Sequence, residues 1–270
     1  MQMRSLYREH TPIDEVVIKG VTVFVKRDDL FGRAPAPPLG KLRGLRIVLR
    51  NLYANDARLV GCWDTRVSKL GEGLAAACRE FPEMRAIVSY PTRIGTPLPG
   101  PVSRAAALGA TVLPLRGNHV AICFAQAKRV VEAQGGTMLP FGLECPEAVE
   151  GVAKEAARVP LDLCRGTIVL CCGSGVTLAG LLIGLKQLPL RLIGISSGRS
   201  LPKIRACVKR YVAKPPECVE LVEALMPYDC VSTVECPFPA HPNYDLKAWQ
   251  YLQNNVRRMK QPILFWNIGG

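Results

Sequence analysis

The sequence of 270 residues lacks any apolar run long enough to cross a bilayer. Its longest runs, residues 167–172 and 178–185, are far shorter than the roughly 20 residues of a membrane-spanning helix. Residues 1–8 also lack the continuous apolar stretch of a secretory signal. We therefore expect a cytoplasmic protein with no membrane partner.

Metal-binding cysteine spacings are missing as well, although the chain contains 11 cysteines. No Cys-x-x-Cys pair occurs, and only Cys171 and Cys172 are adjacent. Neither a zinc site nor a disulfide framework has the required spacing. The favoured interpretation is that these cysteines are thiols packed as small hydrophobic groups, and no metal is expected.

Acidic residues are too few to balance the basic ones. The chain has 35 Lys and Arg against 22 Asp and Glu, a formal net charge of +13. Clustered cations would bind nucleic-acid phosphates, but we expect acidic residues to be scattered between them along the chain. No zinc finger, helix-turn-helix or aromatic RNA-binding motif is found. We expect a basic, solvated surface that favours anionic ligands, with no specific nucleic-acid partner.

The composition, 49% hydrophobic and 21% charged, is that of a globular protein rather than a disordered one. Short apolar segments alternate with longer amphipathic ones, which predicts an α/β fold. Strands are expected at residues 15–18, 21–26, 58–61, 85–89, 111–114, 167–171, 191–195 and 263–266. Helices are expected at residues 42–52, 72–80, 102–108, 121–132, 147–158, 177–188, 202–212 and 246–255.

The strongest local motif is the glycine loop, residues 173–177, between an expected strand and an expected helix. Glycines let the backbone approach an anion, and free amides at a helix start favour negative charge. The motif is neither a Walker A loop nor a dinucleotide fingerprint, because Leu178 stands where the latter has glycine. It predicts a phosphate-binding loop; a tight turn capped by Ser174 and Thr177 is the alternative.

A second motif places Lys41 where a proline-rich loop, residues 35–38, meets a helix. The helix dipole opposes a positive charge at that end, so the amine should lose its proton more readily and act as a nucleophile. The alternative is an ordinary solvated lysine at a helix start.

Residues 25–30, with the sequence Val-Lys-Arg-Asp-Asp-Leu, and the segment Gly40-Lys41-Leu42-Arg43 together resemble motifs of the fold-type II pyridoxal phosphate enzymes. The most similar branch is the 1-aminocyclopropane-1-carboxylate deaminase and D-cysteine desulfhydrase group. The glycine loop, residues 104–112 and residues 263–270 follow in that family's order, so the resemblance covers nearly the whole chain.

The resemblance implies the two-domain, three-layer α/β/α fold of the tryptophan synthase beta-like type. Residues 1–50 and 160–270 would form the larger cofactor-binding domain, and residues 51–159 the smaller one. It also implies pyridoxal 5'-phosphate as cofactor and a homodimer. The expected function is a deaminase or β-eliminating lyase that acts on a small amino acid through a lysine aldimine. A β-replacement enzyme of the cysteine or threonine synthase kind and a non-catalytic, ligand-binding relative are the alternatives.

The resemblance assigns roles to particular residues. Lys41 would carry the cofactor and move the substrate proton. The phosphate would be bound by Gly173, Ser174, Gly175, Val176 and Thr177. Lys26 is expected to be a structural ion-pair partner, and Lys69 is the reserve for the catalytic lysine.

Three positions depart from the family pattern. Gly40 replaces the asparagine before the lysine, and residues 65–73 replace the loop that receives the substrate carboxylate. There Ser68 and the amides around Gly71 are the expected substrate-binding groups. Residues 267–270 read Asn-Ile-Gly-Gly where the family has His-Thr-Gly-Gly, so the threonine hydroxyl expected near the pyridine nitrogen is missing, and Asn267 is its expected substitute. Tyr244 is a candidate general acid or pocket wall; alternatively it packs beneath a helix that Asp245 caps.

Overall fold

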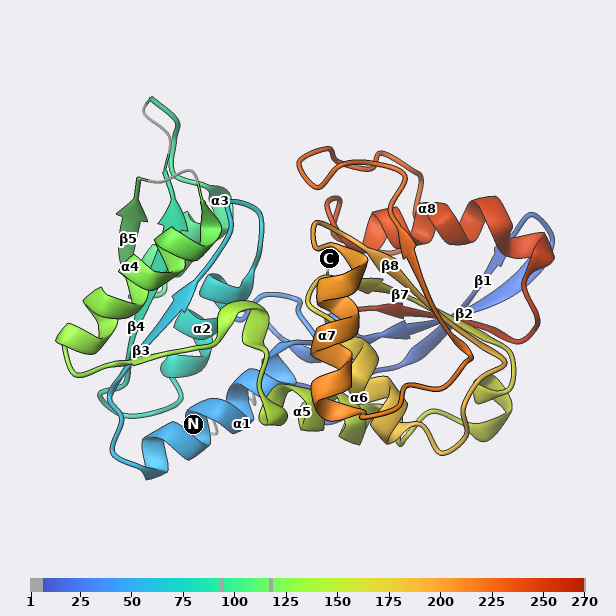
Figure 1. Cartoon of the computed structure of the whole chain (residues 1–270), viewed down its shortest axis with the longest axis horizontal. Coiled ribbons are helices and arrows are strands. Elements are labelled where there is room, and N and C mark those ends of the chain that lie inside the picture. The colour runs from blue at the N-terminus through green and yellow to red at the C-terminus, as the bar shows by residue number, and fades with distance from the viewer. Residues whose placement is uncertain (1–6, 93–94, 117–118, 270) are drawn as a thin grey trace. The chain divides into compact units, whose positions relative to one another are not determined.

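The computed structural model describes residues 7–92, 95–116 and 119–269, in which helices and strands alternate (Figure 1). They form two compact units. The first unit comprises the described residues of Met1–Gly32, Pro38–Arg43 and Glu144–Gly270, and the second those of Arg33–Pro37 and Gly44–Leu143. None of the helices in the described ranges is long and apolar enough to span a bilayer.

The first unit is built on a six-stranded sheet with the order β1-β2-β10-β7-β8-β9. Its strands are β1 (Ile13–Ile18), β2 (Val21–Arg27), β7 (Thr167–Cys172), β8 (Arg191–Ser196), β9 (Val219–Glu223) and β10 (Ile263–Asn267). Strands β1 and β2 pair antiparallel, and the other pairs are parallel. The central strand β7 is buried along its whole length, as expected for a parallel strand covered on both faces.

Helices cover both faces of this sheet (Figure 1). They are α5 (Pro146–Ala156), α6 (Val176–Gly184), α7 (Leu201–Tyr211) and α8 (Asp245–Asn255). Alternate strand residues such as Val169 and Phe265 pack with Trp249 of α8 on one face. On the other face α5 and α6 lie in close contact, because a Cβ at Gly180 would be only 2.5 Å from the side chain of Val152.

The second unit contains a parallel four-stranded sheet with the order β5-β4-β3-β6. Its strands are β3 (Leu59–Trp63), β4 (Arg85–Pro91), β5 (Thr111–Leu115) and β6 (Thr137–Met138). Its helices are α2 (Leu70–Cys78), α3 (Gly100–Ala107) and α4 (Val120–Ala133), together with most of α1 (Leu42–Ala54). Val131 of α4 packs against Leu59 and Ile87 in its core.

Short 3-10 helices complete the described chain. They are η1 (Asp28–Phe31), η2 (Phe141–Leu143), η3 (Leu161–Cys164) and η4 (Val256–Arg258).

The α/β class is confirmed, and every expected helix and strand is present within a few residues. The expected domains divide at residues 50 and 160, whereas the two compact units divide at residues 43 and 144. Helix α5 belongs to the first unit because it packs on α6 and because its Glu155 is buried beside Lys26 and Arg43.

Candidate active site

The glycine loop lies at the carboxyl end of β7, immediately before α6. Gly175 has φ +104°, in the left-handed region that favours glycine. A Cβ at Gly173 would meet no atom within 4 Å, so open space adjoins the loop. The hydroxyl of Ser174 accepts the N–H of Val176 at 3.5 Å, as the turn alternative expects. The hydroxyl of the buried Thr177 makes no hydrogen bond to another described residue.

Lys41 directly precedes α1 and is half-buried. Its position is fixed by the C-terminal segment, because the N–H of Gly40 donates to the carbonyl of Ile268 at 2.6 Å. A Cβ at Gly40 would lie 2.2 Å from Oδ2 of Asp28. Any larger residue, including the family's asparagine, would therefore collide with Asp28 unless that carboxylate moved.

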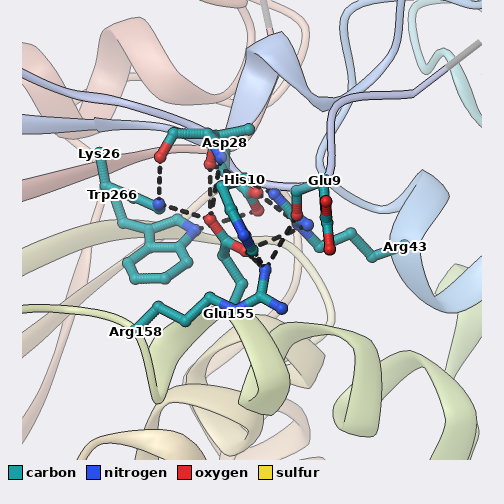
Figure 2. A network of polar contacts seen from close by, with 9 residues as sticks. Glu9, His10, Lys26, Asp28, Arg43, Glu155, Arg158 and Trp266 are labelled. Atoms are coloured by element: carbon teal, nitrogen blue, oxygen red, sulfur yellow. Dashed lines mark hydrogen bonds and ion pairs between the residues drawn. The ribbon is translucent and has the colours of Figure 1, made fainter.

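A buried ionic network holds the start of α1 (Figure 2). Nε of Arg43 donates to Oδ1 of Asp28 at 2.8 Å, and Nη1 of Arg43 lies 3.2 Å from Oε2 of Glu155. Nζ of Lys26 lies 2.5 Å from Oε1 of Glu155. Trp266 donates from Nε1 to the other oxygen of Asp28. The expectation that Lys26 is a structural ion-pair partner is confirmed, and the network positions Arg43 two residues after Lys41.

The network also sets the ionisation of its carboxyl groups. Burial by itself would raise the pKa of Glu155, but the cations of Arg43 and Lys26 bring that pKa below its ordinary value. For Asp28, burial raises the pKa and outweighs the opposing effect of Arg43.

Asn267, at the end of β10, is fully buried and keeps one polar atom without a partner. Its Nδ2 donates to the carbonyl of Pro239 at 2.9 Å, so the remaining atom is the acceptor Oδ1. This Oδ1 has no hydrogen-bond partner in the described part of the chain. Because a buried unpaired acceptor is costly, the atom is suited to receive a proton donor from a ligand.

Asp245 is a site residue that the sequence analysis considered only as a helix cap. Its carboxylate accepts the N–H groups of Ile268 at 3.1 Å and Gly269 at 3.3 Å, so the capping role is wrong. Burial raises the pKa of Asp245 to about 7, although those two amides and the nearby charge of Lys41 act to lower it. The carboxyl group thus joins α8 to the segment that follows Asn267.

Tyr244 precedes Asp245 and shares a hydrogen bond with a second tyrosine. Its hydroxyl lies 2.7 Å from the hydroxyl of Tyr228, and its ring packs edge-on against His241. The expected general-acid role stays a prediction. Tyr228, which lies in the same loop-rich segment before α8, belongs to this polar group.

In the second unit the structure alters the expected carboxylate site. The N–H of Gly71 donates to Oδ2 of Asp64 at 2.5 Å, and this buried carboxylate also accepts the N–H of Thr65. In this structure a carboxylate of the chain itself occupies the Gly71 amide, and the expected role of that amide in substrate binding stays a prediction. Ser68 accepts the N–H of Leu70 and keeps its own hydroxyl hydrogen to donate.

Most of the expected site residues gather at one edge of the first unit's sheet. Strands β7 and β10 are parallel neighbours, so the glycine loop and Asn267 follow them at the same carboxyl edge, where ligands of open α/β sheets bind. Lys41 is joined to this edge through Gly40 and Ile268. Ser68 and Gly71 lie in the other unit.

Comparisons with known proteins identify a curated relative and solved structures of similar fold. No family model matches. A glycyl-dTMP PLP-dependent decarboxylase of Pseudomonas phage M6 is 29% identical over 277 aligned residues, covering 96% of this chain and 98% of the relative. A crystal structure of an ACC deaminase homologue superposes with a TM-score of 0.83 at 22% identity, covering 98% of this chain and 90% of that one. Threonine deaminase isoform 2 of Solanum lycopersicum superposes with a TM-score of 0.68 at 17% identity, covering 96% and 78%.

Proposed function

We propose that this chain, a fold-type II pyridoxal phosphate enzyme by its fold and its full-length similarity, decarboxylates an amino-acid group carried on a thymidine nucleotide. The observation that carries the proposal is the alignment with the glycyl-dTMP decarboxylase, which spans 96% of this chain and 98% of the relative. The alignment therefore extends over nearly the full length of both proteins. The solved structures, below 25% identity, support the fold and leave the reaction open.

The residues at the sheet edge fit pyridoxal 5'-phosphate in three respects. The glycine loop offers main-chain amides, open space beside Gly173 and the unpaired hydroxyl of Thr177 to a phosphate dianion. The orphaned Oδ1 of Asn267 suits the protonated ring nitrogen, which is a donor. Lys41 supplies the primary amine that an aldehyde requires.

The bound cofactor supplies a ring that withdraws electrons from the carbon bearing the substrate's amino group. In the proposed reaction the bond from that carbon to the carboxylate breaks, carbon dioxide leaves, and the electron pair stays on the carbon. A proton must then replace the carboxyl group. We assign its delivery to Nζ of Lys41, and Asn267 holds the ring nitrogen protonated so that the ring continues to withdraw electrons.

Deamination or β-elimination of a small amino acid is the second candidate, supported by the motifs around Lys26 and Lys41. The two reactions differ in products, since decarboxylation releases carbon dioxide and keeps the amine, whereas elimination releases ammonia. The comparisons do not favour β-replacement or a non-catalytic role.

The test uses the purified protein loaded with pyridoxal 5'-phosphate and supplied with glycyl-dTMP. Carbon dioxide should be released in an amount equal to the amine product, and Lys41→Ala should abolish release. Borohydride reduction followed by peptide mapping should place the pyridoxyl group on Lys41. Lys69→Ala is the matched control and should keep both the label and the activity. Ammonia as the product, or a label on Lys69, would replace this proposal with the second candidate or with another catalytic lysine.

A further inference from the structure

One long segment of the first unit carries no negative charge. Residues 163–216 contain nine Lys and Arg and no Asp or Glu. The sequence-based expectation that acidic residues are scattered between the basic ones is therefore wrong for this part of the chain. The segment includes the glycine loop and the whole of α7.

Helix α7 concentrates this charge on its exposed side. Its buried residues are Ile204, Cys207 and Val208, whereas Lys203, Arg205 and Lys209 are exposed. At 100° per residue, Lys203 and Arg210 lie along one edge of the exposed face, and Arg205 and Lys209 lie along the other. The helix stands on the near side of the first unit in Figure 1.

The helix is packed directly against the glycine loop. A Cβ at Gly175 would lie 3.1 Å from the carbonyl oxygen of Ile204, and Arg199, just before α7, donates to the carbonyl of Ser174 at 3.5 Å. The basic face therefore begins beside the proposed phosphate site.

The acidic group that pairs with cations of this segment is already shared between two of them. Glu144 forms ion pairs with Arg199 and Arg210. Lys203, Arg205 and Lys209 make no hydrogen bond or ion pair with any other residue in the described ranges. Three cations on one helix are thus left to solvent and to an anionic partner.

We propose that the exposed face of α7 binds the phosphodiester backbone of DNA, so that the thymidine nucleotide reaches the site as part of a strand. The inference rests on the proposed function for its substrate. Lys and Arg contacts to phosphates release counterions and carry no sequence information, which agrees with the absence of a base-reading motif. An anionic membrane fits less well, because the centre of the face carries Pro202 and Ala206 rather than large apolar side chains.

The test compares two triple variants with the same loss of charge. Lys203→Gln, Arg205→Gln and Lys209→Gln neutralise the α7 face. Arg165→Gln, Lys186→Gln and Lys260→Gln remove three exposed cations elsewhere in the first unit and serve as the control. Fluorescence anisotropy with a labelled duplex of about two helical turns, over a range of salt concentrations, measures binding by the cofactor-loaded protein.

The α7 variant should bind at least about tenfold more weakly at low salt, and the slope of log K against log salt should fall by about 2.7, or 0.9 for each lost phosphate contact. The control variant should change both values much less. Equal losses in the two variants would overturn the proposal, as would a loss of binding to anionic vesicles but not to DNA.

A further measurement separates this proposal from the proposed function. With free glycyl-dTMP both variants should decarboxylate at the unaltered rate. DNA binding that depends on α7, with no carbon dioxide from either form of the substrate, would contradict the proposed reaction and leave the surface standing. Decarboxylation of free nucleotide without α7-dependent binding would contradict the surface alone.

Discussion

Asp245 shows how a single buried carboxyl group can make stability depend on pH. Its pKa in the folded protein is about 7, against roughly 3.9 for an unperturbed aspartate. The folded state therefore holds this proton more tightly than the unfolded state. The stability linked to Asp245 is present at low pH and is lost as the pH rises from about 4 to about 7.

Replacement of this residue should remove that dependence. Raising the pH from about 5 to about 8 should shift the difference in free energy of unfolding between Asp245→Asn and wild type by about 2 to 3 kcal/mol in favour of the variant. Only the wild-type protein loses the stability linked to this proton, and each pK unit corresponds to about 1.4 kcal/mol. Urea unfolding of both proteins at the two pH values measures the difference. A constant offset between them would show that Asp245 does not titrate in this range.

At the same scale, the sequence indicates residues whose chemistry is local and misses those defined by distant contacts. Lys41 and the glycine loop could be predicted because the turn and the helix that follow are adjacent in sequence. The role of Asp245 depends on Ile268, 23 residues away, and the availability of Gly71 depends on the side chain of Asp64. No spacing rule predicts either contact.

Among the elements, α5 is attached to the sheet by a buried charge. Glu155 is 1% exposed and is the shared partner of Lys26 and Arg43. Removal of one member of such a network leaves buried charges uncompensated, which typically costs about 3 to 5 kcal/mol.

Glu155→Ala should therefore lower the free energy of unfolding by about that amount. Glu150→Ala is the matched control on the same helix, because Glu150 forms a solvent-exposed pair with Lys154 and should cost less than about 1 kcal/mol. Urea denaturation of the three proteins tests this. Similar losses in both variants would mean that the network contributes no more than a surface ion pair.

The elements themselves were largely predictable from periodicity, and the exceptions have physical causes. Strand β6 has two residues, too few for any alternation to be seen, and β9 lies at a sheet edge with half-buried residues. Helix α6 ends at Gly184 rather than at residue 188. Its sequence is apolar on all sides, so no change of pattern marks the end.

For the whole molecule, the discontinuous division was indicated by the family resemblance, but its boundaries were not. They depend on which residues α5 and α1 contact, and the ion pairs of Glu155 join segments more than 100 residues apart. Composition alone described the charge poorly, because a net value of +13 does not reveal that one 54-residue stretch has no acidic residue.

The eleven cysteines allow the integrity of both units to be followed in one measurement. All are free thiols, and seven are buried, three half-buried and one, Cys230, exposed. Burial raises the pKa of Cys78 and Cys172 to about 12, and that of Cys145 and Cys236 to about 11. Since the thiolate is the reactive form, these groups should react slowly at neutral pH.

In the native protein, a thiol reagent such as DTNB at about pH 8 should therefore modify one cysteine rapidly. Cys230→Ser should remove that fast phase, whereas Cys218→Ser, the half-buried control, should retain it. In urea without reductant, all eleven thiols of the wild-type protein should react. Several fast thiols in the native protein would show that its cysteine-containing core is more open than the structure describes, and fewer than eleven in urea would reveal a disulfide.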